Sequence, residues 1–427
     1  MSDLELTQDF PAATKSDWLA LVEKGLRGAE YDSLTRKTED GIERGPLSTA
    51  EDLPADIAPL PRAEAPLLEG RPWHITAPVG DPDIGHANKQ MLEDLTGGAS
   101  AVRLQVAPHG YGVDLQTQSD WKRLFEQVHT DLIPITIAPT VNRGLYQLLQ
   151  SIPTLEKAQI NLGLGLQQDS HLIKSIAGEV PSTWKLLTIG TSKNHNFGTT
   201  EAQELAEFAH EAAHIFRFLG AEMAVRHIVL ELSVNQDTHL NIVKIRAARR
   251  IYAQIAESFG IANANLSVHA VTSDRMMQSI DPWTNMLRLM SATFGAVVGG
   301  ADYITTHPFT QSIGLATPFG HRVSRNMQLM MMEESHLGQV KDAAYGSYFH
   351  DRMTENLATK AWRMFQILEG CNTLDEANAA IKQLDPKGYI SPTDNPRKAD
   401  PILGVTLHPL EKDNTAYREA KVRRAAS

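Results

Sequence analysis

The 427-residue sequence contains little cysteine, few aromatic residues and no excess of positive charge. Its one cysteine, Cys371, excludes an intrachain disulfide framework and fits a reducing compartment. The formal net charge of −11 argues against a nucleic-acid or anionic-membrane partner, because both require basic surface. No apolar run reaches membrane-spanning length, and the first residues lack the basic and apolar pattern of a secretory signal. These absences predict a cytoplasmic protein.

The sequence does contain a repeated alternation of short apolar strands and amphipathic helices. The strands are expected at 101–107, 132–138, 158–164, 186–191, 228–233, 266–270 and 303–306, with a short eighth near 339–341. The helices are expected at 85–97, 143–150, 201–219, 239–258, 322–337 and 352–369, with another opened by Asp281-Pro282. Such alternation predicts an α/β fold with a parallel sheet, and eight units predict a (β/α)8 TIM barrel.

Three regions are expected along the chain: an N-terminal arm, the barrel, and a C-terminal extension. Their bounds are 1–71, 72–370 and 371–427. In the arm, 17–22 is amphipathic and the proline-rich segment 42–70 is expected to extend over a surface. In the C-terminal extension, a helix at 373–384 and a strand at 402–406 are expected.

Polar residues near the predicted strand ends are candidates for the barrel mouth, where the chemistry of such barrels takes place. His269 and His307 are each expected to end a strand, and Gln105 lies near the end of the first one. A histidine there can bind a carboxylate or hydrogen-bond a thioester oxygen; the alternative is a histidine that pins a loop. No carboxylate lies at metal-ligand spacing near either histidine, so no metal site is expected.

A second candidate is the segment Asn194-His195-Asn196, which follows the fourth predicted strand. Thr199 or Thr200 is expected to cap the next helix, with Glu204 in its first turn. Helix capping explains these residues but leaves the role of His195 open.

Many matches in order and spacing show that the stretch 266–347 resembles the barrel domain of the methylmalonyl-CoA mutase family. The matching residues include Arg275-Met276-Met277, Asp281-Pro282-Trp283, Gly299-Gly300-Ala301-Asp302, Arg325-Asn326, Glu333-Glu334-Ser335 and Gly346-Ser347. The arm resembles the small (beta) subunit branch of that family at Phe10-Pro11, Trp18, Asp40-Gly41-Ile42 and Pro46-Leu47. In that branch the arm packs against a partner chain, so the resemblance implies an obligate partner.

The sequence departs from the catalytic members of the family at two places. These have an arginine, a glutamine and a tyrosine where this chain has Thr76, Ala77 and Pro78. They also have a tyrosine–histidine pair where this chain has Asn194 and His195. Each replacement removes a contact to substrate or cofactor, so no catalytic residue is assigned, and His195 and His269 remain the candidates.

Cobalamin binding in this family requires a further domain, marked by an Asp-x-His-x-x-Gly loop whose histidine ligates cobalt. The near match at 169–174 begins Asp169-Ser170-His171 but lacks the glycine. The sequence ends at Ser427, which leaves no room for that domain after the barrel. The expectation is therefore that this chain binds no cofactor and that adenosylcobalamin is carried by another chain.

Three functions remain open. The first is a small-subunit-like, non-catalytic partner of a catalytic large subunit that interconverts methylmalonyl-CoA and succinyl-CoA, in a heterodimer. The second is an active acyl-CoA mutase that uses a separately encoded cobalamin-binding subunit, with His195 and His269 lining its site and an acyl-CoA as ligand. The third is a stand-alone regulatory or binding barrel.

Overall fold

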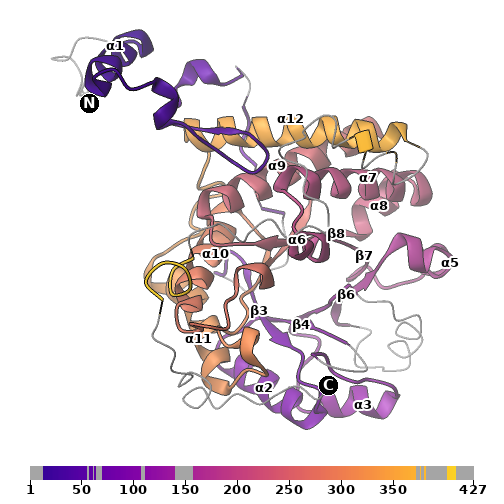
Figure 1. Cartoon of the computed structure of the whole chain (residues 1–427). Coiled ribbons are helices and arrows are strands. Elements are labelled where there is room, and N and C mark those ends of the chain that lie inside the picture. The colour runs from indigo at the N-terminus through magenta and orange to yellow at the C-terminus, as the bar shows by residue number, and fades with distance from the viewer. Residues whose placement is uncertain are drawn as a thin grey trace, which may run out of the picture.

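The computed structural model describes residues 13–54, 57–60, 62–63, 70–106, 111–139, 157–371, 376, 379–380 and 402–409. In this part of the chain eight parallel strands form a closed barrel with helices around it (Figure 1). The strands are β3 (His74–Val79), β4 (Ala101–Leu104), β5 (Pro134–Ile137), β6 (Gln159–Leu164), β7 (Trp184–Gly190), β8 (Ile228–Val234), β9 (Ser267–Thr272) and β10 (Tyr303–Thr305). Strand β10 pairs with both β9 and β3, so the last strand closes the barrel onto the first. The predicted TIM barrel is confirmed.

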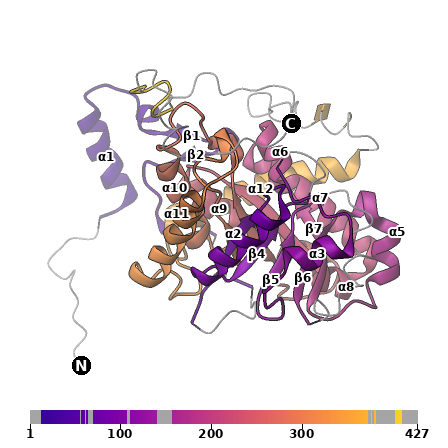
Figure 2. The same cartoon turned by 90° about the horizontal axis from the view of Figure 1, so that it is seen from below.

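Helices of very different length cover the barrel, as the view from below also shows (Figure 2). They are α2 (Ile84–Thr96), α3 (Gln118–Leu124), α5 (Leu166–Ile176), α6 (Ser192–Phe197), α7 (Glu201–Leu219), α8 (Ala221–His227), α9 (Thr238–Ser258), α10 (Asn285–Gly299), α11 (Pro318–Leu329) and α12 (Tyr348–Gly370). Short 3₁₀ turns lie at Tyr31–Leu34, Ala50–Asp52, Asp274–Met276 and Gln311–Ile313, and a π-helical turn at Met330–Glu334. The three longest helices, α7, α9 and α12, pack against one another on one side of the barrel.

Helix α7 has the bounds that were predicted, because its end signals are strong. The Thr200 hydroxyl accepts a hydrogen bond from the amide of Gln203, whose side chain reaches back to the Thr200 amide. Gly220, with φ of +82°, ends the helix. Between these ends the buried face carries several alanines, whose small side chains allow close packing, together with Phe208 and Phe216.

Two strand predictions were wrong: one strand was missed and one expected strand does not form, so the total of eight is unchanged. The first barrel strand is β3, which the sequence did not identify because His74, Thr76 and Pro78 interrupt its apolar pattern. All six of its residues are nevertheless buried. The strand expected at 339–341 is an exposed bend, so β10 is the eighth strand rather than the seventh.

Other boundaries also differ from expectation. The strand expected at 402–406 is a turn flanked by an isolated bridge. Helix α10 begins at Asn285 after a turn, in which Asp281 accepts a hydrogen bond from Thr284 instead of capping the helix directly. The predicted helix at 143–150 lies outside the described residues, and the one at 373–384 is described only at 376 and 379–380.

The N-terminal arm has two parts with different relations to the barrel. Its first helix, α1 (Lys15–Leu26), has no buried residue and projects away from the barrel in Figure 1. The short hairpin of β1 (Arg36–Lys37) and β2 (Glu43–Arg44) is held on the outer helices instead. Asp40, in its turn, is buried and accepts a hydrogen bond of 3.1 Å from the amide of Ala202 in α7.

Further contacts fix the arm beyond the hairpin. Arg44 pairs with Asp237 at the start of α9, and Arg352 of α12 donates to the carbonyl of Glu43. Arg62 donates to the Ala301 carbonyl before β10. The arm therefore extends over the barrel surface in its described part, as predicted, while α1 stands apart.

Candidate functional site

The barrel strands carry an unusual number of buried polar side chains. Branched apolar residues dominate the interior of most TIM barrels. Here the buried polar residues on the strands include His74, Thr76, Thr136, Asn161, Thr188, Glu231, Ser233, Ser267, His269 and Thr305. The candidate site is therefore the barrel interior and the carboxyl ends of its strands.

An ion pair crosses this interior. Arg103 lies on β4 and Glu231 on β8, and three strands separate β4 from β8 in either direction around the barrel. Arg103 donates from Nε to Glu231 Oε2 and from Nη2 to Oε1, both at 2.8 Å. This bidentate geometry is the strong form of an arginine–carboxylate contact.

Both members of the pair are charged in spite of their burial. Burial raises the pKa of Glu231, but the charge and hydrogen bonds of Arg103 outweigh it, so the pKa lies below its usual value. Burial lowers the pKa of Arg103, and Glu231 outweighs that in turn, so the guanidinium pKa is raised. The interior thus holds a permanent positive and negative charge in direct contact.

A cavity of about 260 Å³ lies toward the amino ends of the strands, lined by the first residues of β5, β6, β9 and β10. His269 lines it, at the third position of β9 and not at the end of that strand, so its expected place in the mouth is wrong. Its Nε2 lies 2.8 Å from Thr305 Oγ1. Burial lowers the pKa of His269 to about 3, so its imidazole is neutral.

At the carboxyl ends of the strands, His195 lies in α6 and is buried. Its Nε2 is 3.1 Å from Ser273 Oγ, after β9, and its Nδ1 is 3.3 Å from Glu204 Oε2. Arg275 donates to the His195 carbonyl at 3.0 Å. Burial and then the charge of Lys244 lower the pKa of His195, so it is held neutral in a packed network.

Glu204 is the centre of that network. It accepts a 2.7 Å hydrogen bond from Lys244 of α9 and a 2.6 Å bond from Thr191 after β7. Burial opposes its ionisation, but Lys244 and His195 outweigh it and lower the pKa to about 2. Glu204 is in the first turn of α7, as predicted. Its carboxylate bonds Lys244 and so joins α7 to α9.

The other three candidates lie apart from one another. His307 follows β10 as expected, and its Nδ1 is 2.9 Å from the Thr272 carbonyl, which is the geometry of a histidine that pins a loop. Asn194 is exposed and donates to Glu207 on the outer side of α6. Gln105 follows β4, where its amide and carbonyl bond to the backbone of neighbouring segments. Of the five predicted residues, His195 and His307 bond the consecutive residues Ser273 and Thr272, whereas His269 lies toward the amino ends of the strands.

A second cavity, of about 270 Å³, opens at the carboxyl end of β3 between α2 and the start of α11. Pro78 lines it, together with Tyr111 and Lys89. Thr76 is engaged within its own strand, because its hydroxyl donates to the His74 carbonyl. Burial raises the pKa of Tyr111 to about 12, so it is neutral.

The near match to a cobalt-ligating loop does not fit cobalamin. Asp169 and His171 lie on α5 and not on a loop. Asp169 is buried and its carboxylate accepts a hydrogen bond from the Gly165 amide just before that helix. His171 is exposed. This segment is therefore part of a helix and not a ligand loop.

Sequence reasoning missed Arg103, Glu231 and Lys244. A signal was present, since a single arginine interrupts the apolar strand at 101–104 and a single glutamate the one at 228–234. Fully buried charges are rare unless they are paired. Two single charges of opposite sign on buried strands therefore predict an ion pair between them.

The chain was compared with known proteins. The family profile of methylmalonyl-CoA mutase matches residues 166–391. The chain is 31% identical to the methylmalonyl-CoA mutase small subunit of Streptomyces virginiae, over 97% of this chain and 74% of that protein. It is 30% identical to the methylmalonyl-CoA mutase small subunit of Propionibacterium freudenreichii subsp. shermanii, over 88% of this chain and 65% of that protein. It is 27% identical to the methylmalonyl-CoA mutase of Rhizobium meliloti (strain 1021), over 96% of this chain and 67% of that protein.

The fold and its interior define the class: a parallel (β/α)8 barrel with a polar, charge-bridged interior. Together with the matched profile and relatives, they show that this chain belongs to the methylmalonyl-CoA mutase family. Among the described residues, no helix is long and apolar enough to cross a membrane.

Proposed function

We propose that this chain is the small, non-catalytic subunit of a cytoplasmic heterodimer. Its partner would be a catalytic large subunit that interconverts methylmalonyl-CoA and succinyl-CoA with adenosylcobalamin. Two relatives that match most of this chain carry the name methylmalonyl-CoA mutase small subunit, which supports the assignment.

The observation that carries the proposal is the Arg103–Glu231 pair across the barrel. A thioester substrate that ran along the interior past both strands would have to displace this pair. Separating a buried, bidentate ion pair without replacing its contacts costs about 3–5 kcal/mol. The interior is thus occupied by the protein's own charges, which favours a structural role for the barrel.

The residues near the carboxyl ends of the strands support the same proposal. Ala77 and Pro78 have no group that can contact charge, and Thr76 bonds within its own strand. Asn194 is exposed, and its side chain donates to Glu207 of α7. His195 is neutral and already has two close polar neighbours, Ser273 and Glu204, so it is not poised to meet a substrate.

Adenosylcobalamin supplies radical chemistry when it is bound in an enzyme of this kind. Among the described residues, the near match offers no cobalt ligand in a fitting loop, because Asp169 and His171 lie within α5. We assign the cofactor to the large subunit, and to this chain a part in the stability and assembly of the complex.

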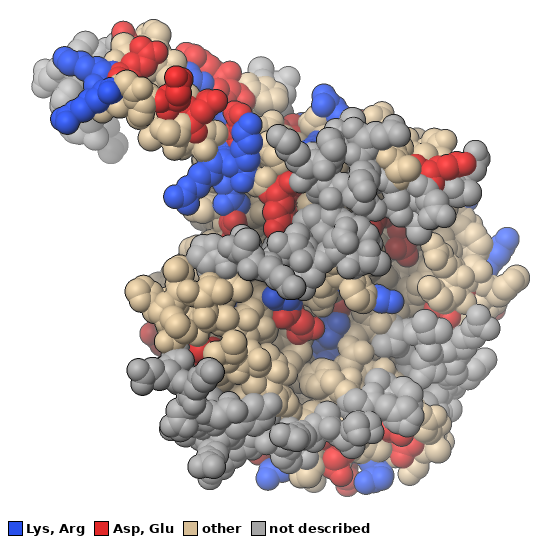
Figure 3. Space-filling view, in the orientation of Figure 1, with Lys and Arg blue, Asp and Glu red and all other residues tan. Residues whose placement is uncertain are grey.

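The arm is the part that we assign to the partner. Helix α1 has no buried residue, although it carries Trp18 and Leu21; the Leu21 side chain is 69% exposed. Figure 3 shows charges of both signs among uncharged surface on this arm. An apolar centre with a charged rim is the ordinary composition of a protein–protein interface.

Turnover of methylmalonyl-CoA with adenosylcobalamin tests the proposal, for this chain alone and co-expressed with its large subunit. We expect no turnover for the chain alone, and an active complex that co-purifies at a fixed ratio. Turnover that needs only an isolated cobalamin-binding subunit would contradict the proposal. A chain that forms no complex with either protein would also contradict it, in favour of a stand-alone regulatory barrel.

One observation favours the second candidate, an active acyl-CoA mutase barrel. His269 lines the 260 Å³ cavity, and its Nδ1 is buried without a hydrogen-bond partner among the described residues. A polar ligand in that cavity could satisfy it. Calorimetric titration of the isolated chain with methylmalonyl-CoA distinguishes the two, since the non-catalytic assignment predicts no binding.

A further inference from the structure

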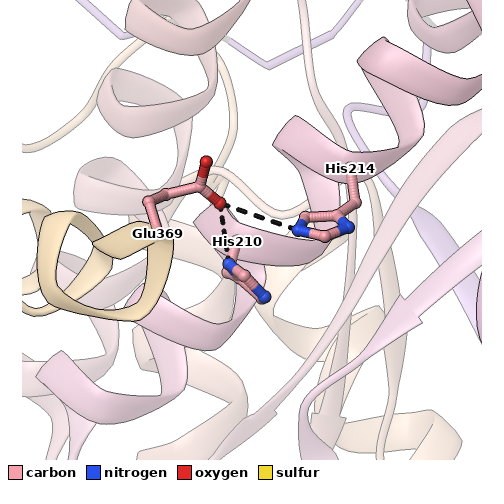
Figure 4. A group of neighbouring side chains, drawn as sticks. All are labelled: His210, His214 and Glu369. Carbon is pink, nitrogen blue, oxygen red and sulfur yellow. Dashed lines mark hydrogen bonds and ion pairs between the residues drawn. The ribbon is translucent and has the colours of Figure 1, made fainter. Parts of the chain in front are cut away.

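Two long helices on the outside of the barrel bring together side chains that metals prefer. His210 and His214 lie on α7, and Glu369 lies in the last turn of α12 (Figure 4). Among the described residues these three form the one group of at least three His, Cys, Asp or Glu side chains able to hold an ion. Their ligand atoms all lie within 4.8 Å of one another.

The distances suit a small tetrahedral ion. Glu369 Oε1 lies 2.8 Å from His210 Nδ1 and 3.8 Å from His214 Nε2. Bonds of about 2.0–2.1 Å at tetrahedral angles place neighbouring ligand atoms roughly 3.3 Å apart. The two observed distances bracket that value, and the ligand atoms of the two histidines lie within 4.8 Å of each other.

The spacing along α7 is an independent signal. Residues 210–214 read His-Glu-Ala-Ala-His, and positions four apart share one face of a helix. A His-Glu-x-x-His segment on a helix is a known pattern of zinc ligands. No metal site was expected from the sequence, because carboxylates were sought only near His269 and His307, whereas this motif lies on the outer layer.

The surroundings of Glu369 favour coordination. Arg217 donates to its other oxygen, Oε2, which leaves Oε1 beside the two histidines. A metal ion binds the carboxylate and the neutral imidazole, which are the deprotonated forms of these groups.

We propose that His210, His214 and Glu369 form a binding site for one divalent transition-metal ion, with zinc as the best fit. Two imidazoles and one carboxylate are a common zinc ligand set, and a water completes four-fold coordination. His210 coordinates through Nδ1 as the neutral tautomer, which carries its one ring proton on Nε2.

The site is accessible, and its supporting contacts are in place. The side chains of His210, His214 and Glu369 are 36%, 50% and 21% exposed. Arg217 orients the carboxylate from outside the ligand set. The ion would join α7 to the end of α12 just before Cys371, and so tie the last barrel helix to its neighbour.

Glu211 offers a matched control. It stands between the two histidines in sequence but is outside the ligand group, and it lies beside Glu207. A second control is the pair His239 and His350, whose Nδ1 and Nε2 are 3.0 Å apart but which belong to no three-ligand group among the described residues. Each control resembles the site in composition but lacks its three-ligand geometry.

The experiment is a calorimetric titration of the untagged, EDTA-treated full chain with zinc chloride. Cobalt(II) chloride is the optical probe, because its visible absorbance reports tetrahedral coordination. We expect one ion per chain, and an increase in Tm with zinc because the ion binds only the folded state. His210→Ala, His214→Ala and Glu369→Gln should each weaken binding by more than about 10-fold, whereas Glu211→Gln and His239→Ala should not.

Three results would overturn the proposal: no zinc binding at micromolar concentrations, binding retained in the His210→Ala/His214→Ala double variant, or binding lost in His239→Ala. Circular dichroism checks that each variant is folded. If Glu369→Gln does not fold, the half-exposed His214→Ala still decides the outcome. The site lies outside the barrel interior, so the test does not depend on the proposed function.

Discussion

Arg103 and Glu231 face each other across the barrel and form two hydrogen bonds of 2.8 Å. Their strands lie on opposite sides of the ring, so this one contact links two halves of the barrel wall. An ion pair in such a place resists separation, because each charge has lost its water and has only the other in exchange.

Substitution of one partner should therefore cost far more than substitution of both. We expect Arg103→Leu to lower the free energy of unfolding by about 3–5 kcal/mol, since it leaves Glu231 charged and buried. The double variant Arg103→Leu/Glu231→Leu should recover most of that loss. Urea unfolding at pH 7 measures both. The exposed pair Lys37–Glu43 is the control, and Lys37→Ala should cost less than about 1 kcal/mol.

The exposed helix α1 should determine assembly without affecting the barrel. We expect Trp18→Asp combined with Leu21→Asp to weaken the complex with the large subunit at least about 30-fold, as loss of an interface hot spot of about 2 kcal/mol would. Analytical ultracentrifugation measures the affinity. The Tm of the isolated chain should stay the same, because neither residue is buried. A complex of unchanged affinity would contradict the assignment of the arm to the partner.

Asp40 should make the attachment of the arm depend on pH. Burial, and then Glu201, raise its pKa from 3.8 to about 7, although the Ala202 amide and Lys360 act in the opposite direction. Between these two values the folded state holds the proton more tightly than the unfolded state, so this group's contribution to stability falls as pH rises.

The variant Asp40→Asn removes that titration. We expect it to be more stable than the natural protein at pH 8, by more than about 1 kcal/mol, and the difference to shrink as pH falls toward 4. Chemical unfolding of both proteins across this pH range measures the difference. A difference that stays constant with pH would show that Asp40 titrates normally.

His195 separates a structural role from a catalytic one. In the co-expressed complex, His195→Ala should leave the turnover rate within about twofold, yet lower the free energy of unfolding by about 1–3 kcal/mol, because Ser273 and Glu204 lose a buried neighbour. His269→Ala should behave likewise. A turnover rate reduced by about 100-fold or more, the scale on which loss of an acid or base acts, would place the residue in a working site.

The sequence predicted the barrel because periodicity and end signals are local. Helix α7 was placed correctly from its amphipathic pattern, with Thr199 or Thr200 expected as the cap. Strand β3 was missed because its burial comes from pairing with β10 and β4, which its own residues do not reveal. The candidate site was only partly predicted for the same reason: Arg103 and Glu231 are 128 positions apart, and closure of the ring brings them together.

The order in which the chain is made bears on how the arm reaches its place. The hairpin at 36–44 and Arg62 leave the ribosome early, but they dock on α7, α9, α12 and the start of β10, which are made much later. Strand β3 must likewise wait for β10 before the ring can close. The arm is therefore the earliest segment to be synthesised and among the last to settle. A partner that binds α1 can therefore do so before the barrel has folded.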